Sequence, residues 1–155
     1  MDWNSALLGF KAYLRLERSL SVHSIAAYLR DVRKLGNYAT TQNPPVGPVQ
    51  MQPHQFEAFI IEEGSQGLSR RSQARLISGI RAFYKYLMME DALDVDPTEL
   101  LEGPKLSRKI PDVLSVNEIN RILNSIDIST SHGMRNRAML ETLYASGLRV
   151  SELVN

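Results

Sequence analysis

The segment from Ser69 to Met89 constrains the fold most, because its basic and apolar side chains separate at the repeat of an α-helix. At about 100° per residue, the bases fall within one arc of about 140° and the apolar side chains within another of about 120°, and the arcs do not overlap. The small residues Ala74, Ser78 and Ala82 lie between the bases. The sequence therefore predicts a helix with one face in a core and a basic face outside. The bases are Arg70, Arg71, Arg75, Arg81 and Lys85, and the apolar residues are Leu76, Ile77, Ile80, Phe83, Tyr84 and Leu87.

The charge of the whole chain conceals this basic face. The 155 residues carry 18 bases and 17 acids, for a net charge of +1. Five bases and no acid fall between residues 64 and 86, whereas six acids and no base fall between residues 87 and 102. Because charges beyond the Debye length of about 8 Å are screened, a basic patch followed by an acidic one can still attract phosphates. The pattern therefore allows a nucleic-acid partner, although solvated helices also show such asymmetry.

Apolar residues recur at helical spacing along the rest of the first hundred residues. Helices are predicted over residues 2–17, from the N-cap Ser21 through Leu35, and over residues 52–63. The prolines between Asn43 and Pro48 predict a loop there. Together with the helix over 69–89, these segments predict a four-helix domain over residues 1–100.

Residues 101–111 contain a glycine, two prolines and three bases, which predicts a basic linker. Ser115 and Glu118 then form a capping box, and a helix over 134–145 is predicted to present Leu140, Leu143 and Tyr144 to a second core. Gly147 ends that helix, and residues 148–153 begin another. The predicted fold class is therefore all-α, with a second domain beginning at residue 112. The last helix is too short to bury its apolar face well, so we expect the chain to be a piece of a longer protein.

The residue content also excludes several kinds of chemistry. A chain without cysteine has no disulfide, thiol nucleophile or Cys-ligated metal, which fits a reducing cytoplasm. The histidines His23, His54 and His132 share no ligand-like spacing, so we expect no metal site. No nucleotide-binding glycine motif, export signal or apolar run of roughly 20 residues occurs. We therefore expect a cytoplasmic protein with no cofactor.

The run from Arg135 to Leu153, RNRAMLETLYASGLRVSEL, resembles the first catalytic-arginine box of tyrosine recombinases of the Xer and phage-integrase type. The resemblance continues through residues 111–119, the usual entry to the catalytic domain. It also includes residues 20–31 and 68–87, which are similar to the helical core-binding (SAM-like) domain. The implied fold is a complete four-helix core-binding domain followed by the first helices of a mixed α/β catalytic domain.

The family resemblance implies site-specific DNA recombination. Two domains hold duplex DNA, and a tyrosine hydroxyl attacks a phosphate to form a 3′-phosphotyrosyl intermediate without a cofactor. Arg149 matches the first catalytic arginine, and its planar guanidinium suits two phosphate oxygens. Glu152 either orients Arg149 or is a solvated acid at a helix N-terminus. The resemblance also implies a tetramer on two DNA sites, in some cases with a second recombinase.

The other catalytic groups of the family follow the arginine box, and none can be placed in this sequence. They are a lysine, a His-x-x-Arg box, a second His or Trp, and the tyrosine nucleophile. All six tyrosines precede Arg149, and Tyr28, Tyr84 and Tyr144 are predicted to lie in cores. We therefore expect the chain to bind duplex DNA weakly without cleaving it. The C-terminal segment that the family's subunits usually exchange is also missing, so we expect a monomer.

The predicted DNA-binding residues come from the basic helical faces and the linker. They are Ser24, Arg30, Arg33, Lys34, Arg70, Arg71, Arg75, Ser78, Arg81, Lys85 and Lys105. Two alternatives remain open: a short DNA-binding regulator without catalytic activity, and a helical module whose bases meet an acidic protein. The sequence also leaves open whether the DNA target is a chromosome-dimer site or a mobile element.

Overall fold

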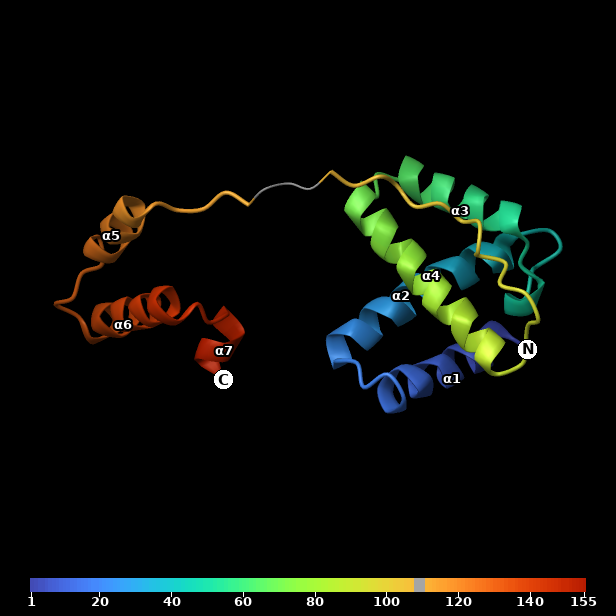
Figure 1. Cartoon of the computed structure of the whole chain (residues 1–155), viewed down its shortest axis with the longest axis horizontal. Coiled ribbons are helices and arrows are strands. Elements are labelled where there is room, and N and C mark those ends of the chain that lie inside the picture. The colour runs from blue at the N-terminus through green and yellow to red at the C-terminus, as the bar shows by residue number, and fades with distance from the viewer. Residues whose placement is uncertain (108–110) are drawn as a thin grey trace. The chain divides into compact units, whose positions relative to one another are not determined.

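The structure is a computed structural model that describes residues 1–107 and 111–155. The described residues form seven α-helices and one short 3₁₀ helix and contain no β-strand. They divide into two compact units, one over Met1–Ser107 and the other over the described part of Arg108–Asn155 (Figure 1). The predicted all-α fold class is confirmed.

The first unit contains the four predicted helices, and short polar side chains cap three of them. Asp2, Ser21 and Ser69 each accept hydrogen bonds from backbone N–H groups in the first turn of the helix that follows. The remaining helix begins with Pro53, whose missing N–H has no partner to lose at this position. The helices are α1 (Trp3–Leu16), α2 (Val22–Thr41), α3 (Pro53–Ser65) and α4 (Arg70–Met89).

Helix α4 packs against α1, α2 and α3, and its apolar face is buried as predicted (Figure 1). Burial of each large apolar side chain contributes about 1.5–3 kcal/mol before entropy is counted. Six such side chains fix the rotation of α4 about its own axis and turn its basic face outward. Leu76, Ile77, Ile80, Phe83, Tyr84 and Leu87 are each at most 2% exposed.

Tyr86 is a further core residue of α4 that lies outside the predicted apolar arc. It is 6% exposed, and its ring centroid lies 5.6 Å from that of Phe10 and 5.4 Å from that of Tyr13. A Cβ at Gly9 would lie 2.1 Å from the Tyr86 hydroxyl oxygen, so only glycine leaves room for this ring. Contact with α1 therefore widens the buried face of α4.

The proline-rich connection after α2 is held by two aromatic donors. The Trp3 indole N–H donates to the carbonyl of Val46 at 2.9 Å, and the Tyr84 hydroxyl donates to the carbonyl of Pro48 at 2.8 Å. Burial raises the pKa of Tyr84, so the hydroxyl stays a donor. The predicted loop needs one correction, because Pro48 begins the 3₁₀ helix η1 (Pro48–Gln50). A proline fits there because the first residue of a helix needs no N–H donor.

The core of the first unit extends one residue into the predicted linker. Leu101 is 6% exposed and belongs to the core cluster, and its carbonyl accepts a hydrogen bond from Arg81. Lys105 lies beyond this anchor and is exposed. The other two bases of the predicted linker, Arg108 and Lys109, lie outside the described residues.

The second unit contains α5 (Val116–Asn124), α6 (Ser131–Ser146) and α7 (Val150–Val154). The predicted capping box is confirmed at the start of α5: the Ser115 backbone N–H and hydroxyl both donate to Glu118 at 2.8 Å, and the Glu118 N–H donates back. The predicted end of α6 is confirmed at Gly147, whose φ of 66° is left-handed.

The predicted core of the second unit is wrong within this chain. Tyr144 is 54% exposed, Leu140 is 38% exposed and Leu143 is half-buried. Among the described residues of this unit only Gly133 is buried. Among the described residues of this unit, α6 packs against both α5 and α7, but these short helices have too few neighbours to cover their apolar faces.

Tyr84→Phe should lower the free energy of unfolding of the first unit by about 1–2 kcal/mol, because it leaves the buried Pro48 carbonyl without its donor. Chemical denaturation followed by circular dichroism measures the change. The matched control is Tyr38→Phe, which removes a hydroxyl that makes no hydrogen bond within residues 1–107 and should change stability by less than about 0.5 kcal/mol. Equal losses in the two variants would contradict the role given to Tyr84.

Candidate nucleic-acid interface

The basic face of α4 lies at the surface, together with bases of the neighbouring helix α2. Ala74 and Ala82 are half-buried between the exposed bases, and Ser78 is exposed with its hydroxyl donating to the Ala74 carbonyl at 3.0 Å. Small side chains of this kind let a helix approach a DNA groove while longer ones reach phosphates or base edges.

Three of the predicted DNA-binding bases have partners inside the first unit. Arg75 donates to the buried carboxylate of Asp31 on α2, and Arg81 donates to the Leu101 carbonyl. Lys34 on α2 donates to Glu63 on α3 at 2.5 Å. These contacts join α2 to α4, α4 to the segment after it, and α2 to α3. The three bases therefore contribute to the fold as well as to the surface charge.

The other predicted bases of α2 and α4 are free to meet a ligand. Each is exposed and makes no side-chain hydrogen bond or ion pair within the described parts of the chain. We call them the free bases: Arg30, Arg33, Arg70, Arg71 and Lys85. Ser24 is half-buried in the first turn of α2, where its hydroxyl accepts a hydrogen bond from Ser21 at 3.0 Å.

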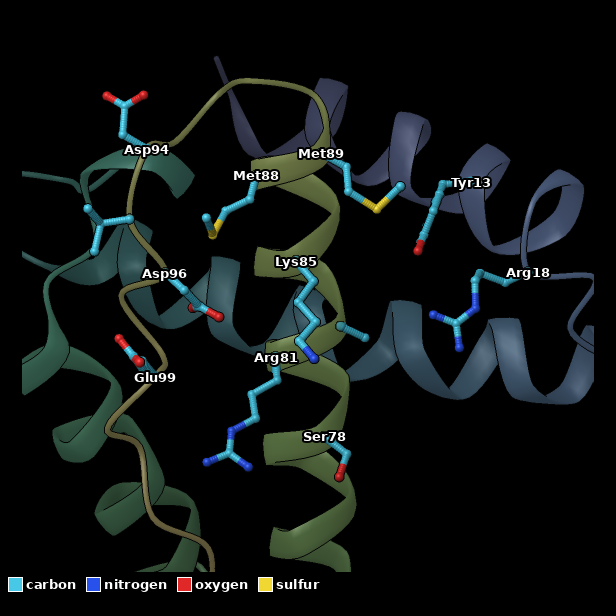
Figure 2. A pocket seen from close by; sticks show the side chains of 12 residues that line it. Tyr13, Arg18, Ser78, Arg81, Lys85, Met88, Met89, Asp94, Asp96 and Glu99 are labelled. Carbon is cyan, nitrogen blue, oxygen red and sulfur yellow. The ribbon is translucent and has the colours of Figure 1, made fainter.

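A groove of about 920 Å³ runs along the C-terminal half of α4. Arg81 and Lys85 lie between Arg18, which follows α1, and the acids Asp96 and Glu99 (Figure 2). The basic and acidic residues occupy separate, consecutive blocks of the sequence. In the fold, two acids of the second block line the same groove as Arg81 and Lys85. These acids reduce the positive potential at Arg81 and Lys85.

Asp31 is an acid that the charge pattern of the sequence did not indicate as part of the site. The residue is 1% exposed. Burial raises the pKa of Asp31, while Arg75, Arg30 and Lys34 act in the opposite direction and favour its charged form. The signal available in the sequence was a single acid within the basic stretch from Arg30 to Lys34.

Arg149 lies at the start of α7, just after the left-handed turn at Gly147. Its backbone N–H donates to Glu152 at 2.7 Å, and its guanidinium donates to the same carboxylate at 3.3 Å. Glu152 therefore lies at the helix N-terminus and also contacts the Arg149 side chain. The Arg149 side chain is 83% exposed, so an anion can reach it.

Two further properties concern the described residues only. They contain no group of three or more acidic or histidine side chains placed to hold a metal ion. They also contain no helix long and apolar enough to cross a membrane.

Two family models match this chain. The model for the phage integrase N-terminal SAM-like domain matches residues 7–91, and the model for the phage integrase family matches residues 112–155. The chain belongs to the phage integrase family of tyrosine recombinases, as the resemblance of its motifs predicted.

The curated relatives that the chain resembles include Xer recombinases. It is 37% identical to tyrosine recombinase XerD of Listeria innocua over 151 residues, which are 97% of this chain and 51% of that protein. It is 38% identical to tyrosine recombinase XerD of Staphylococcus aureus over 148 residues, which are 92% of this chain and 48% of that protein. The chain thus spans about half the length of the curated relatives it matches.

Arg75→Ala should lower the free energy of unfolding by about 2 kcal/mol, because it leaves the buried Asp31 carboxylate without its partner; the value is below that of a fully buried pair because Arg75 is half exposed. Arg71→Ala, one turn earlier on α4, removes a free base and should cost less than about 0.5 kcal/mol. Urea denaturation of both variants at pH 7 measures the difference. Similar stabilities would show that the pair does not support the fold.

Proposed function

We propose that the first unit binds duplex DNA through the free bases of α2 and α4, as part of a site-specific tyrosine recombinase. The observation that carries this proposal is a set of exposed bases that make no internal hydrogen bond or ion pair, together with the small residues Ala74 and Ser78 on α4. Such a face meets the negative charge of phosphates without first breaking an ion pair. Ser24, Ser78 and Lys105 are proposed as additional contacts.

In the second unit we assign Arg149 to the scissile phosphate. An exposed guanidinium can grip two phosphate oxygens as charge redistributes in the transition state, and Glu152 keeps it at the start of α7. In this proposal residues 1–100 form the DNA-binding domain, 101–111 the linker and 112–155 the beginning of the catalytic domain. The nucleophilic tyrosine is outside these 155 residues, so the chain binds DNA without cleaving it.

The wider biology of the proposal follows the same family logic. The recombinase acts in the cytoplasm as a tetramer on two DNA sites, with or without a second recombinase, whereas the 155-residue chain is a monomer. Its chemistry needs no metal or nucleotide, because arginines supply the positive charge and a tyrosine supplies the nucleophile.

Duplex binding should weaken steeply with salt. If the face contacts about five phosphates, a fourfold rise in salt should lower the affinity by about 500-fold, because bound counterions are released. Fluorescence anisotropy with a 30-base-pair duplex of random sequence measures this. A flat salt response would contradict the proposal.

The double variant Arg70→Glu/Arg71→Glu should abolish duplex binding and leave the helical content unchanged. Both side chains are free bases, whereas reversal of Arg75 would place a second carboxylate against Asp31 and disturb the fold. The control is Lys11→Glu, an exposed base on α1 outside the face, which should bind nearly as the wild type does. Unchanged binding by the double variant would favour the module that meets an acidic protein.

A suicide DNA substrate, nicked so that a cleaved strand is lost, should give no covalent complex with the chain. The six tyrosines all precede Arg149 and include Tyr13, Tyr84 and Tyr86 in the core. Denaturing gel electrophoresis detects the phosphotyrosyl link. A trapped complex would refute the assignment of the nucleophile to a segment outside residues 1–155.

A further inference from the structure

The ion pair between Asp31 and Arg75 is unequal in its exposure. The Asp31 side chain is 2% exposed and the Arg75 side chain is 48% exposed. The carboxylate is thus inside the unit, while half of the arginine faces outward from α4. A guanidinium carries five N–H donors in a fixed plane, and Nη1 provides the contact to Asp31. Donors on the outer part of the group remain for an acceptor outside the protein.

The fold brings these two groups together through a close approach of α2 and α4. Gly79 lies one turn after Arg75, and a Cβ there would lie 3.1 Å from Oδ2 and 3.2 Å from Cβ of Asp31 and 3.3 Å from a ring carbon of Tyr28. The missing side chain at Gly79 lets the Asp31 carboxylate lie against α4, within reach of Arg75. The Asp31 side chain is 2% exposed, so its carboxylate is enclosed where α2 and α4 meet.

Because bases surround Asp31, its position affects the proposed DNA binding as well as the stability of the fold. Arg30 and Lys34 of α2 act on it along with Arg75, so this buried acid lies close to bases of the proposed DNA-binding face. By charge alone, an acid in this position weakens the attraction of the face for phosphates. An acid that also orients an arginine has the opposite effect, because a side chain held in place loses less freedom when it binds.

We propose that Asp31 is a positioning residue for DNA binding, which holds the Arg75 guanidinium at the surface of α4 so that its outer donors meet DNA. The inference rests on the proposed function and distinguishes two roles among the bases of the DNA-binding face. The free bases supply long-range attraction, and the anchored Arg75 supplies a contact of fixed geometry. Arg75 therefore belongs to the DNA-binding face even though it has an internal partner.

The test is the sign of the effect of Asp31→Asn, which keeps the shape of the side chain and removes its charge. Binding to a random-sequence 30-base-pair duplex should weaken by about threefold to tenfold, although the variant carries one more net positive charge. In an Arg75→Ala background the same substitution should tighten binding, because only the repulsion of DNA by Asp31 is left to remove. Tighter or unchanged binding by Asp31→Asn alone would overturn the proposal.

A second variant tests the arginine without disturbing the acid. Arg75→Lys keeps the charge and can still reach Asp31, but it lacks the planar fork, so it should bind the duplex at least about threefold more weakly than the wild type. If Arg75→Lys bound as tightly as the wild type, Arg75 would contribute only its charge, and the positioning role of Asp31 would be refuted. Far-UV circular dichroism confirms that each variant is folded at the assay temperature.

The outcomes also separate this inference from the proposed function. If the wild-type chain shows no salt-dependent duplex binding, both fail. If the wild type binds and Arg70→Glu/Arg71→Glu does not, while Asp31→Asn and Arg75→Lys bind like the wild type, the face stands and only the positioning role of Asp31 is refuted.

Discussion

Helix α4 buries seven apolar or aromatic side chains against its neighbours. Because its bases occupy the opposite side of the helix, that burial also determines which side chains the first unit exposes to solvent. The neighbouring contacts follow from its rotation. Tyr84 reaches the Pro48 carbonyl, Tyr86 meets the rings of α1, and Arg75 meets Asp31. A change that turned α4 by one residue would break all three contacts at once, so the fold and the basic face depend on the same packing.

The surface charge of the first unit is shaped by which bases the fold uses for itself. Lys34, Arg75 and Arg81 join helices or segments, and the remaining bases of α2 and α4 face solvent. The acids that follow α4 return along its C-terminal half and share a groove with Arg81 and Lys85. A net charge of +1 therefore conceals a basic helix face, since five bases and no acid lie between residues 64 and 86.

The second unit shows the contrast between local and tertiary order. Its helices form because caps and turns act over three or four residues, as at Ser115 and Gly147. Its apolar side chains stay largely exposed, because three short helices with few contacts cannot enclose a core. Arg149 is nevertheless placed by a local contact, since Glu152 accepts hydrogen bonds from its backbone N–H and its guanidinium within one turn. The position of the proposed catalytic arginine thus depends on contacts within one helical turn and not on a packed core.

The sequence by itself determined that the helices form, the caps at Ser21, Ser115 and Gly147, and the two faces of α4, because each depends on residues that are near one another along the chain. Its motifs also determined the family. The tertiary structure decided which bases are free, because the partners of Arg75, Lys34 and Arg81 are 44, 29 and 20 residues away. It also decided that Leu101 belongs to the core and that Tyr144 does not. Spacing along the chain predicts the face on which a side chain lies, but only packing decides what lies opposite that face.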